Sequence, residues 1–293
     1  MHKKRETLPM KIMLTLLLSA LCAFAFEIGN GKSLILTLDD SHGVLELNDR
    51  NITVLPHPLY PKKGIAIIPI DYHEHPHLIN AQWTTPDETI ALEFNVTSAT
   101  YPTEVITVDH AKVSPPPEVL ERIALEKAEA EAIYNHITPK RYWNKPFIRP
   151  IDSITTSQYG SARTYNGVLK SYHGGVDFRA KTPLPILASN DGVVVLVKER
   201  YYAGGTVIID HGEGVYSCYF HLSQFNVKVG DPVIQGQNIA LSGATGRITG
   251  PHLHFGFMLQ GIQSDPIEFM AQIETLFTQS RIMVYNSKKS PIL

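Results

Sequence analysis

Short runs of β-branched and aliphatic residues recur along this chain and restrict it to a fold made mainly of β-strands. In the first half, each run holds six to eight residues and is bounded by Gly, Pro, Asn or Asp, which favour turns. The runs are SLILTL, GVLELN, NITVLP, GIAIIPI, TIALEFNV and EVITVDHA. Their spacing predicts an all-β, sandwich-like module over residues 26–113.

A proline-rich break ends this β pattern. Three consecutive prolines at 115–117 form a stiff hinge, and residues 118–136 combine apolar residues at helical spacing with many Ala, Glu and Lys. We therefore expect a hinge and a linker helix within residues 114–145. Two roles are open for the helix: a spacer, or a clamp that holds the N-terminal module against a second domain.

A second β-rich domain is predicted over residues 146–278. Its clearest strand-like runs are GVVVLVKER, GTVIIDHG, GVYSCYFHL, NVKVG and HLHFGFML, joined by glycine-rich turns. A closing helix follows, with Asp265 as its N-cap and Pro266 at its first position. We expect residues 279–293 to be a flexible tail.

The first 25 residues have the pattern of a signal peptide. A basic stretch precedes an apolar run over residues 12–21, which is short for a membrane span. Ala23 and Ala25 occupy the positions that a signal peptidase reads, so the expected mature N-terminus is Phe26. Met10 is an alternative start. The protein is thus expected to be exported to the periplasm or cell envelope, tethered to the inner membrane if the signal is uncleaved.

Charge and cysteine content exclude some classes of function. The net charge is −2, from 26 basic and 28 acidic residues without a basic stripe, so no nucleic-acid partner is expected. Cys22 lies in the signal, which leaves Cys218 unpaired. Cys218 is either a buried strand residue, which we favour, or a catalytic thiol near His221. The histidine-rich run at 73–77 contains a proline and indicates an exposed loop rather than a metal site.

Five polar residues in the second half lie beside glycines or in strand-like runs. They are His173 and Asp177 in SYHGGVDF, His221 in YFHLS, and His252 and His254 in GPHLHFG. Buried His and Asp side chains are costly unless they are paired or coordinated. Two imidazoles, one carboxylate and an open position describe a catalytic zinc site, with two histidines left to move protons. A polar cluster or a purely structural metal is the alternative.

Spacing does not decide which histidine of the HLH pair binds the metal. His252 and His254 are two residues apart in a strand-like run, so both side chains lie on one face. Either imidazole can therefore reach an ion on that face.

At these residues the chain resembles the lysostaphin-type zinc metallopeptidases, which cut the peptide part of bacterial peptidoglycan. The resemblance covers about residues 147–269. It rests on HGGVDF, on YFHLS, on the stretch from Gly243 to Phe255, and on the Asp-Pro pair at 265–266. It implies an antiparallel β-sheet domain with its site in a groove walled by loops.

The resemblance also implies roles for individual residues. The implied zinc ligands are His173, Asp177 and His254, and the implied catalytic histidines are His221 and His252. Tyr165 and Asn166, in SARTYNG, lie where such loops contact substrate. Arg247 and Thr249 are further loop residues without an assigned role.

These features together predict an exported metalloendopeptidase that uses Zn²⁺ to hydrolyse peptide cross-links of peptidoglycan. Its expected partners are peptidoglycan peptide stems, on which it acts as a D,D-endopeptidase and also as a carboxypeptidase, and it is expected to be a monomer. The alternative is a non-catalytic domain that binds or activates other wall hydrolases. A further hypothesis is that the N-terminal module and the helix cover the groove.

Overall fold

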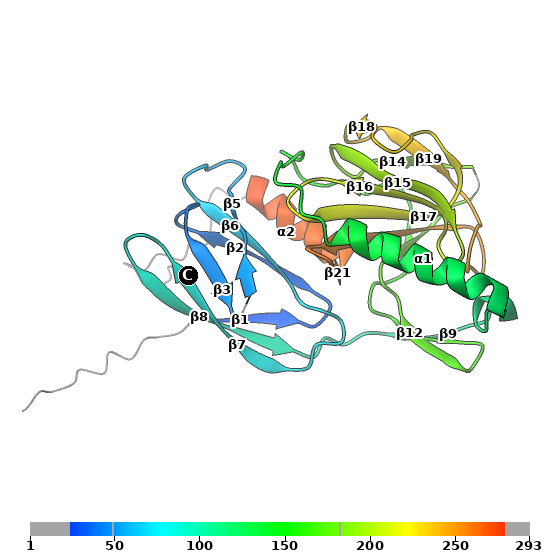
Figure 1. Cartoon of the computed structure of the whole chain (residues 1–293), viewed down its shortest axis with the longest axis horizontal. Helices are drawn as coiled ribbons and strands as arrows, with labels where there is room; N and C mark the ends of the chain where they lie inside the picture. The colour runs from blue at the N-terminus through cyan, green and yellow to red at the C-terminus, as the bar shows by residue number, and fades with distance from the viewer. Residues whose placement is uncertain (1–23, 49, 182, 279–293) are drawn as a thin grey trace, which may run out of the picture.

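The computed structural model describes residues 24–48, 50–181 and 183–278. The predicted signal peptide lies almost entirely outside the described residues, and the predicted tail lies wholly outside them. No helix in these ranges is long and apolar enough to cross a membrane. The mainly β fold predicted from the sequence is confirmed (Figure 1).

The N-terminal module consists of sheets that share one apolar core. One sheet has the order β1-β8-β7-β3-β4 and the other the order β2-β6-β5. Their bounds are β1 Phe24–Gly29, β2 Ser33–Leu38, β3 Val44–Leu47, β4 Arg50–Ile52, β5 Val54–Pro56, β6 Gly64–Pro69, β7 His77–Thr84 and β8 Thr89–Thr97. Alternation along β7 buries Ile79, Ala81 and Trp83 while their neighbours face solvent. Leu38 of β2 and Phe94 of β8 belong to the same buried cluster, so both sheets face one core.

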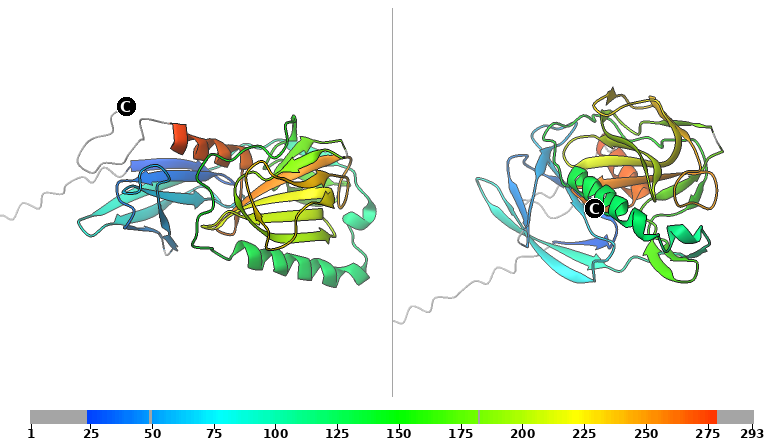
Figure 2. Two further views of the ribbon diagram at one scale, coloured as in Figure 1. Left: turned by 90° about the horizontal axis from the view of Figure 1, so that it is seen from above. Right: turned by 45° about the vertical axis from the view of Figure 1, so that its right-hand side comes forward.

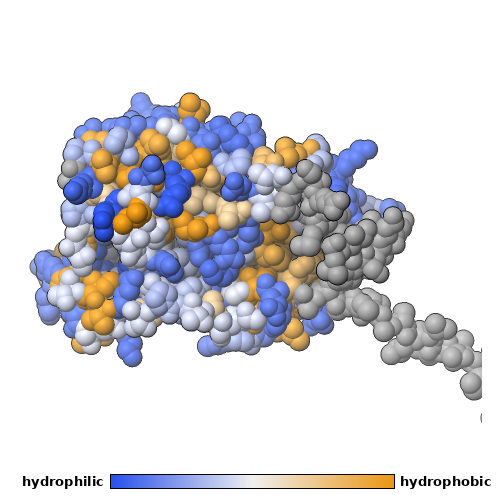
Figure 3. Space-filling model, turned by 180° about the vertical axis from the view of Figure 1, so that it is seen from behind, coloured by the Kyte–Doolittle hydropathy of each residue, from blue (hydrophilic) through white to orange (hydrophobic). Residues whose placement is uncertain are grey.

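The C-terminal domain is an antiparallel sheet of order β10-β13-β20-β17-β16-β15-β18, extended by β14, β19 and β21 (Figure 1). The bounds are β10 Thr155–Ser157, β13 Val176–Arg179, β14 Pro185–Leu187, β15 Gly192–Arg200, β16 Gly204–Asp210, β17 Val215–Phe225, β18 Pro232–Val233, β19 Asn238–Ser242, β20 His252–Leu259 and β21 Ile262–Ser264. Seen from behind, polar and apolar residues are interspersed over this domain (Figure 3).

A small third sheet joins the two halves of the chain. Its order is β12-β11-β9, with β9 at Thr103–Ile106, β11 at Ala162–Tyr165 and β12 at Leu169–Tyr172. The sequence placed β9 in the N-terminal module, but it pairs in parallel with β11. The run is β-branched, as predicted. Its partner, however, is a hairpin that precedes β13.

Helix α1, Pro117–Tyr134, lies along the C-terminal domain (Figure 2). A short 3₁₀ turn, η1 at His110–Lys112, precedes it. Glu126 of α1 accepts hydrogen bonds from Arg122 Nε at 2.7 Å and from the Tyr201 backbone N–H at 2.8 Å. The helix is thus fixed on the strands of the C-terminal domain by a buried carboxylate.

Helix α2, Pro266–Thr278, packs between the two β regions (Figure 2). The predicted cap is present, because Asp265 Oδ1 accepts from the backbone N–H of Ile267 at 2.9 Å. Lys32 Nζ bridges Asp265 and Glu268 at 2.7 and 2.9 Å. The Gln272 side chain donates to the carbonyl of Ser33 at 2.7 Å. The N-terminal module is therefore docked on α2 and its cap through ion pairs and a side-chain hydrogen bond to the backbone of β2.

Candidate metal centre

Three side chains from neighbouring strands bring ligand atoms to one point. His173 follows β12, Asp177 lies in β13 and His254 lies in β20, and the β13–β20 register pairs Asp177 with His254. Asp177 Oδ1 is 2.9 Å from His173 Nε2 and 2.8 Å from His254 Nδ1, and these two nitrogens are 2.8 Å apart. One carboxylate oxygen and two imidazole nitrogens therefore converge, as a metal site requires.

Hydrogen bonds to backbone carbonyls fix the orientation of several imidazoles. Nδ1 of His173 donates to the carbonyl of Gln158 at 2.8 Å, Nδ1 of His221 to Thr245 at 2.8 Å, and Nδ1 of His252 to Gly250 at 2.7 Å. A carbonyl oxygen only accepts, so each Nδ1 carries the hydrogen. Each Nε2 is left with a free lone pair, as a metal ligand or a proton acceptor needs.

His221 and His252 lie beside the three converging residues. Their ring centroids are 4.8 Å apart, and His221 is 5.9 Å from the His254 ring. His252 Nε2 is 3.6 Å from Asp177 Oδ1. His221 has φ 64°, a left-handed conformation that is uncommon for a non-glycine residue and is typical of functional sites.

A glycine allows the His254 ring to approach β13. A Cβ at Gly175 would lie 2.8 Å from Nε2 of His254 and 2.4 Å from the carbonyl oxygen of Phe255. Any side chain there would displace β20 or the imidazole. The second glycine of the HGGVDF motif thus has a steric role in the site.

Burial sets the protonation of these groups. Burial lowers the pKa of His254 to about 4, although Asp177 opposes the shift. Burial also holds the pKa of His221 well below its usual range, reinforced by the neighbouring His252. Burial alone would raise the pKa of Asp177, but the His173 and His254 side chains against Oδ1 outweigh burial and hold that pKa well below its usual range. At neutral pH His221 and His254 are therefore neutral, and Asp177 is ionised.

These donors fit a zinc ion. Two nitrogens and one oxygen, with an open position, are the ligand set of catalytic zinc sites. Atoms bound to one zinc ion at about 2.0–2.2 Å lie roughly 3.3 Å apart in a tetrahedron, so small shifts of the three atoms admit the ion.

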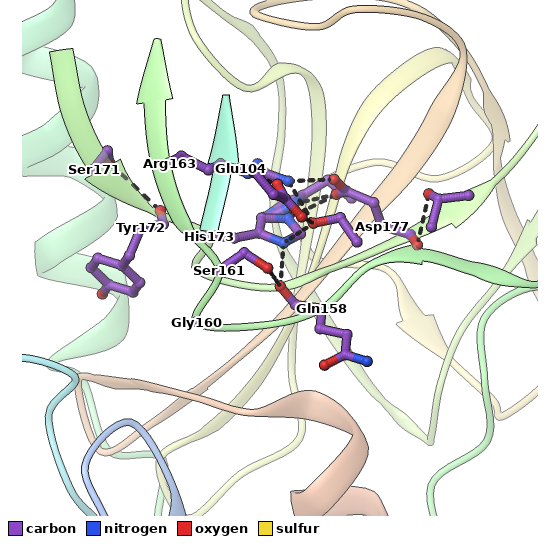
Figure 4. Close-up of polar contacts among 12 residues, drawn as sticks. Glu104, Gln158, Gly160, Ser161, Arg163, Ser171, Tyr172, His173 and Asp177 are labelled. Atoms are coloured by element: carbon purple, nitrogen blue, oxygen red, sulfur yellow. Dashed lines mark hydrogen bonds and ion pairs between the residues drawn. The ribbon is translucent and has the colours of Figure 1, made fainter. Parts of the chain in front are cut away.

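The second oxygen of Asp177 is held by an arginine that the sequence analysis did not single out. Arg163 of β11 donates to Asp177 Oδ2 at 2.8 Å and to Glu104 Oε2 at 2.8 Å (Figure 4). Arg163 stands in the SARTYNG segment, in which the sequence predicts substrate contacts for Tyr165 and Asn166. Nothing in its local sequence indicates a partner as distant as Glu104.

Two hollows border the cluster. One, of about 320 Å³, is lined by Tyr165, Tyr202 and Arg247 together with His173, His221 and His254. Another, of about 410 Å³, is lined by Glu104, Thr249 and His252 together with Asp177. The converging side chains therefore line two recesses that a peptide substrate can enter.

The residues expected to contact substrate have different surroundings. Tyr165 is buried, lines a hollow, and has the Arg247 guanidinium 4.4 Å from its ring centroid. The Asn166 side chain bonds to the backbone N–H and carbonyl of Val108 at 2.9 and 3.0 Å. Tyr165 thus faces the groove, whereas the amide of Asn166 is engaged by the N-terminal segment.

Neither of the two alternative sites considered from the sequence forms part of this group of ligands. Cys218 is buried, its thiol donates to the Tyr134 hydroxyl at 3.5 Å, and burial raises its pKa to about 12. Such a thiol is not a nucleophile at neutral pH. His73, His75 and His77 are exposed, and the described residues place no metal-type cluster there.

Comparison with known proteins identifies the class of this site. Residues 171–266 match the model of peptidase family M23. Peptidoglycan DD-endopeptidase ShyA of Vibrio cholerae serotype O1 is 47% identical over 89 residues, which are 30% of this chain and 21% of that protein. Lysostaphin of Staphylococcus simulans is 39% identical over 118 residues, which are 38% of this chain and 24% of that protein. Residues 171–266 are therefore a segment of peptidase family M23, a family of zinc metallopeptidases.

A similar structure extends beyond the family segment. A crystal structure of a Pseudomonas aeruginosa protein assigned to peptidase M23 is 27% identical, with a TM-score of 0.66. It covers 83% of this chain and 95% of that chain, so the N-terminal module has a structural counterpart there. By contrast, this chain spans only about a fifth to a quarter of the length of the two relatives above.

Proposed function

We propose that this protein is a zinc-dependent endopeptidase that hydrolyses peptide cross-links of peptidoglycan. The observation that carries the proposal is the convergence of His173 Nε2, Asp177 Oδ1 and His254 Nδ1 within 2.9 Å of one another. We assign the ligand role to these three residues. His252 is the less suitable ligand, because its Nε2 is 3.6 Å from the shared carboxylate oxygen.

The chain's own residues then supply proton transfer and orientation. Zinc bound by the three ligands supplies a Lewis acid that polarises a peptide carbonyl and lowers the pKa of water. His252 holds a hydrogen on Nδ1, so its free Nε2 accepts a proton beside the ligands. His221, oriented in the same way by Thr245, offers a second free Nε2; a proton released by the attacking water and taken up there would let this nitrogen donate a hydrogen bond to the developing oxyanion.

The shape of the groove favours cleavage within a peptide. The hollows of about 320 and 410 Å³ border different ligands, His173 and His254 in the first and Asp177 in the second, so a peptide has room beyond a single residue next to the scissile bond. A strict carboxypeptidase needs only one open side. Together with the relative named as a peptidoglycan DD-endopeptidase, this supports endopeptidase activity on D,D cross-links, with carboxypeptidase activity secondary.

Digestion of purified sacculi tests the proposal. The zinc-loaded protein should convert cross-linked muropeptides into monomers, as measured by mass spectrometry, and a chelator should stop the conversion until zinc is restored. Loss of terminal residues without loss of cross-links would assign a carboxypeptidase instead. An unchanged profile would refute catalysis. Stimulation of a second wall hydrolase by the same sample would then support the non-catalytic alternative.

Export to the cell envelope is part of the proposal, since the substrate lies there. The supporting observation is the basic and apolar pattern of residues 1–25, which lie almost entirely outside the described residues. N-terminal sequencing of the protein from an envelope fraction should give Phe26. A mature form that retains residues 1–25 would indicate the tethered alternative.

We also propose that the N-terminal side of the chain limits access to the groove. β9 walls the larger hollow through Glu104, Val105 and Ile106, and Val105 is exposed there. Replacing Val105 with Gly, which removes side-chain bulk at the wall, should raise the rate on intact sacculi. An unchanged rate would remove this role and leave the proposed chemistry unaffected.

A further inference from the structure

Arg163 connects the metal centre to a strand from the N-terminal side of the chain. Its Nε donates to Glu104 Oε2 at 2.8 Å, and one terminal nitrogen donates to Asp177 Oδ2 at 2.8 Å and to Ser157 Oγ at 2.9 Å. Ser157 in turn donates to Glu104 Oε1 at 2.6 Å. Figure 4 shows Arg163, Glu104 and Asp177 close together, with the guanidinium of Arg163 reaching from β11 to Asp177 of β13.

Strand pairing fixes this arrangement. In the parallel β9–β11 register, Glu104 is the partner of Arg163. Directly paired residues point to the same face of a sheet, so the carboxylate and the guanidinium meet without loop flexibility. The side chains of Arg163 and Asp177 are 11% and 9% exposed, so this ion pair is largely shielded from water.

The two oxygens of the Asp177 carboxylate have different partners. Oδ1 faces the two ligand imidazoles, and Oδ2 is occupied by Arg163. A carboxylate with one oxygen held by a planar guanidinium cannot rotate freely about its bond to the chain. Groups that orient ligands in this way set metal affinity almost as strongly as the ligands themselves.

Glu104 offsets the charge of the arginine. An unpaired guanidinium this close to the ligands would repel a divalent cation. Because the site is shielded from water, this repulsion is only weakly screened. The Glu104 carboxylate makes the pair neutral while it holds the guanidinium in its plane. Neither residue lies within residues 171–266, the segment that matches the family model.

We propose that Arg163 and Glu104 are positioning residues of the metal centre, and that β9 therefore completes the site from outside the peptidase segment. The inference rests on the proposed zinc site. It concerns the affinity for the metal, so it can be measured without any substrate.

Substitutions of Arg163 in the full chain test the first link. Zinc affinity is measured by competition with a chromogenic chelator. Arg163→Met should weaken zinc binding by roughly 10- to 100-fold, the usual effect of removing a group that orients a ligand. Arg163→Lys should weaken zinc binding nearly as much, because a single ammonium group cannot reproduce the planar guanidinium that contacts two carboxylates.

A matched control lies in the same hollow. Arg179 lines it, its side chain is exposed, and among the described residues it forms no ion pair. Arg179→Met should bind zinc like the native protein. Native affinity in both Arg163 variants would overturn the proposal, and so would an equal loss in the Arg179 variant.

A double-mutant cycle tests the second link. Glu104→Gln should weaken zinc binding by about tenfold, within the range for outer groups of metal sites. If Glu104 acts through Arg163, the same change should have no further effect in the Arg163→Met protein, because interacting residues are not additive. Native affinity in Glu104→Gln, or full additivity in the double variant, would refute the role of Glu104.

Thermal melting of the zinc-free variants separates positioning from mere stability. A pair that served only the fold would lower the melting temperature and leave zinc affinity native, which would contradict the proposal. The proposed function can fail separately. Variants with the expected affinity losses in a protein that does not cleave sacculi would reject the enzyme and retain the positioning pair.

Discussion

The two β regions of this chain bury different kinds of side chains. The core of the N-terminal module is an apolar cluster that includes Leu45, Trp83 and Phe94. The C-terminal domain also has an apolar core, but it buries His173 and Asp177 as well. Both regions use the same alternation along strands. Among the described residues the N-terminal module buries a single ionisable side chain, His57, whereas the C-terminal domain gathers His173, Asp177 and His254 at one point, which marks the region with a candidate site for chemistry.

The regions are nevertheless not independent, because β6 is buried on both faces. Ala66 and Ile68 belong to the core of the N-terminal module, whereas Ile65 and Ile67 pack in the core of the C-terminal domain. A chain that begins after the linker would expose that second face. The influence of the module on the site is therefore best tested in the intact protein.

Removal of a ligand should give the largest effect. His254→Ala leaves one imidazole and one carboxylate, too few for a stable zinc site. We expect loss of both bound zinc, measured by elemental analysis, and muropeptide release. His42→Ala is the control, since His42 belongs to the N-terminal module and its side chain is 82% exposed. A His254→Ala protein with native zinc content would contradict the ligand assignment.

Removal of the proposed proton acceptor should separate binding from catalysis. His252→Ala should lower turnover by roughly 10²- to 10⁴-fold, the range for general acid–base catalysis, and keep its zinc. The comparison of turnover with zinc content in one sample measures both. Loss of zinc together with activity would make His252 a ligand and reverse the roles within the HLH pair.

A cavity in the N-terminal core should affect stability alone. Phe94 is fully buried, so Phe94→Ala should cost about 3–5 kcal/mol of unfolding free energy. Because β6 contributes to both cores, denaturation should remain a single transition, and fluorescence and activity should report the same midpoint. Turnover of the folded protein should be native. Two separate transitions would show that the regions unfold independently.

Acid should destabilise the zinc-free protein. The pKa values of His254 and His211 are lowered to about 4 by burial, whereas those of unfolded histidines are near 6.5. Between these limits the unfolded chain binds protons that the folded chain does not, so stability falls as the pH falls from about 6.5 to 4. The loss should be on the order of a few kcal/mol. Urea unfolding across this range measures it, and a flat profile would contradict the buried, neutral state.

Much of the site could be predicted from the sequence because its motifs are local. HGGVDF and HLH place their polar residues at fixed short spacings, and the structure brings all five predicted residues together. The assignment within HLH could not come from spacing, since both side chains share a face. The β13–β20 register pairs Asp177 with His254, and this pairing favours His254 as the ligand.

The sequence by itself determined a mainly β chain, a helix after the prolines, and the five polar residues of the candidate site. Those features depend on periodicity and turn residues, which act over a few positions. The tertiary structure alone decided that β9 pairs with β11, that Glu104 meets Arg163, and that β6 is buried on both faces. These contacts join residues dozens of positions apart. Their free energy depends on which surfaces the whole chain brings together, and the local sequence pattern does not specify these long-range contacts.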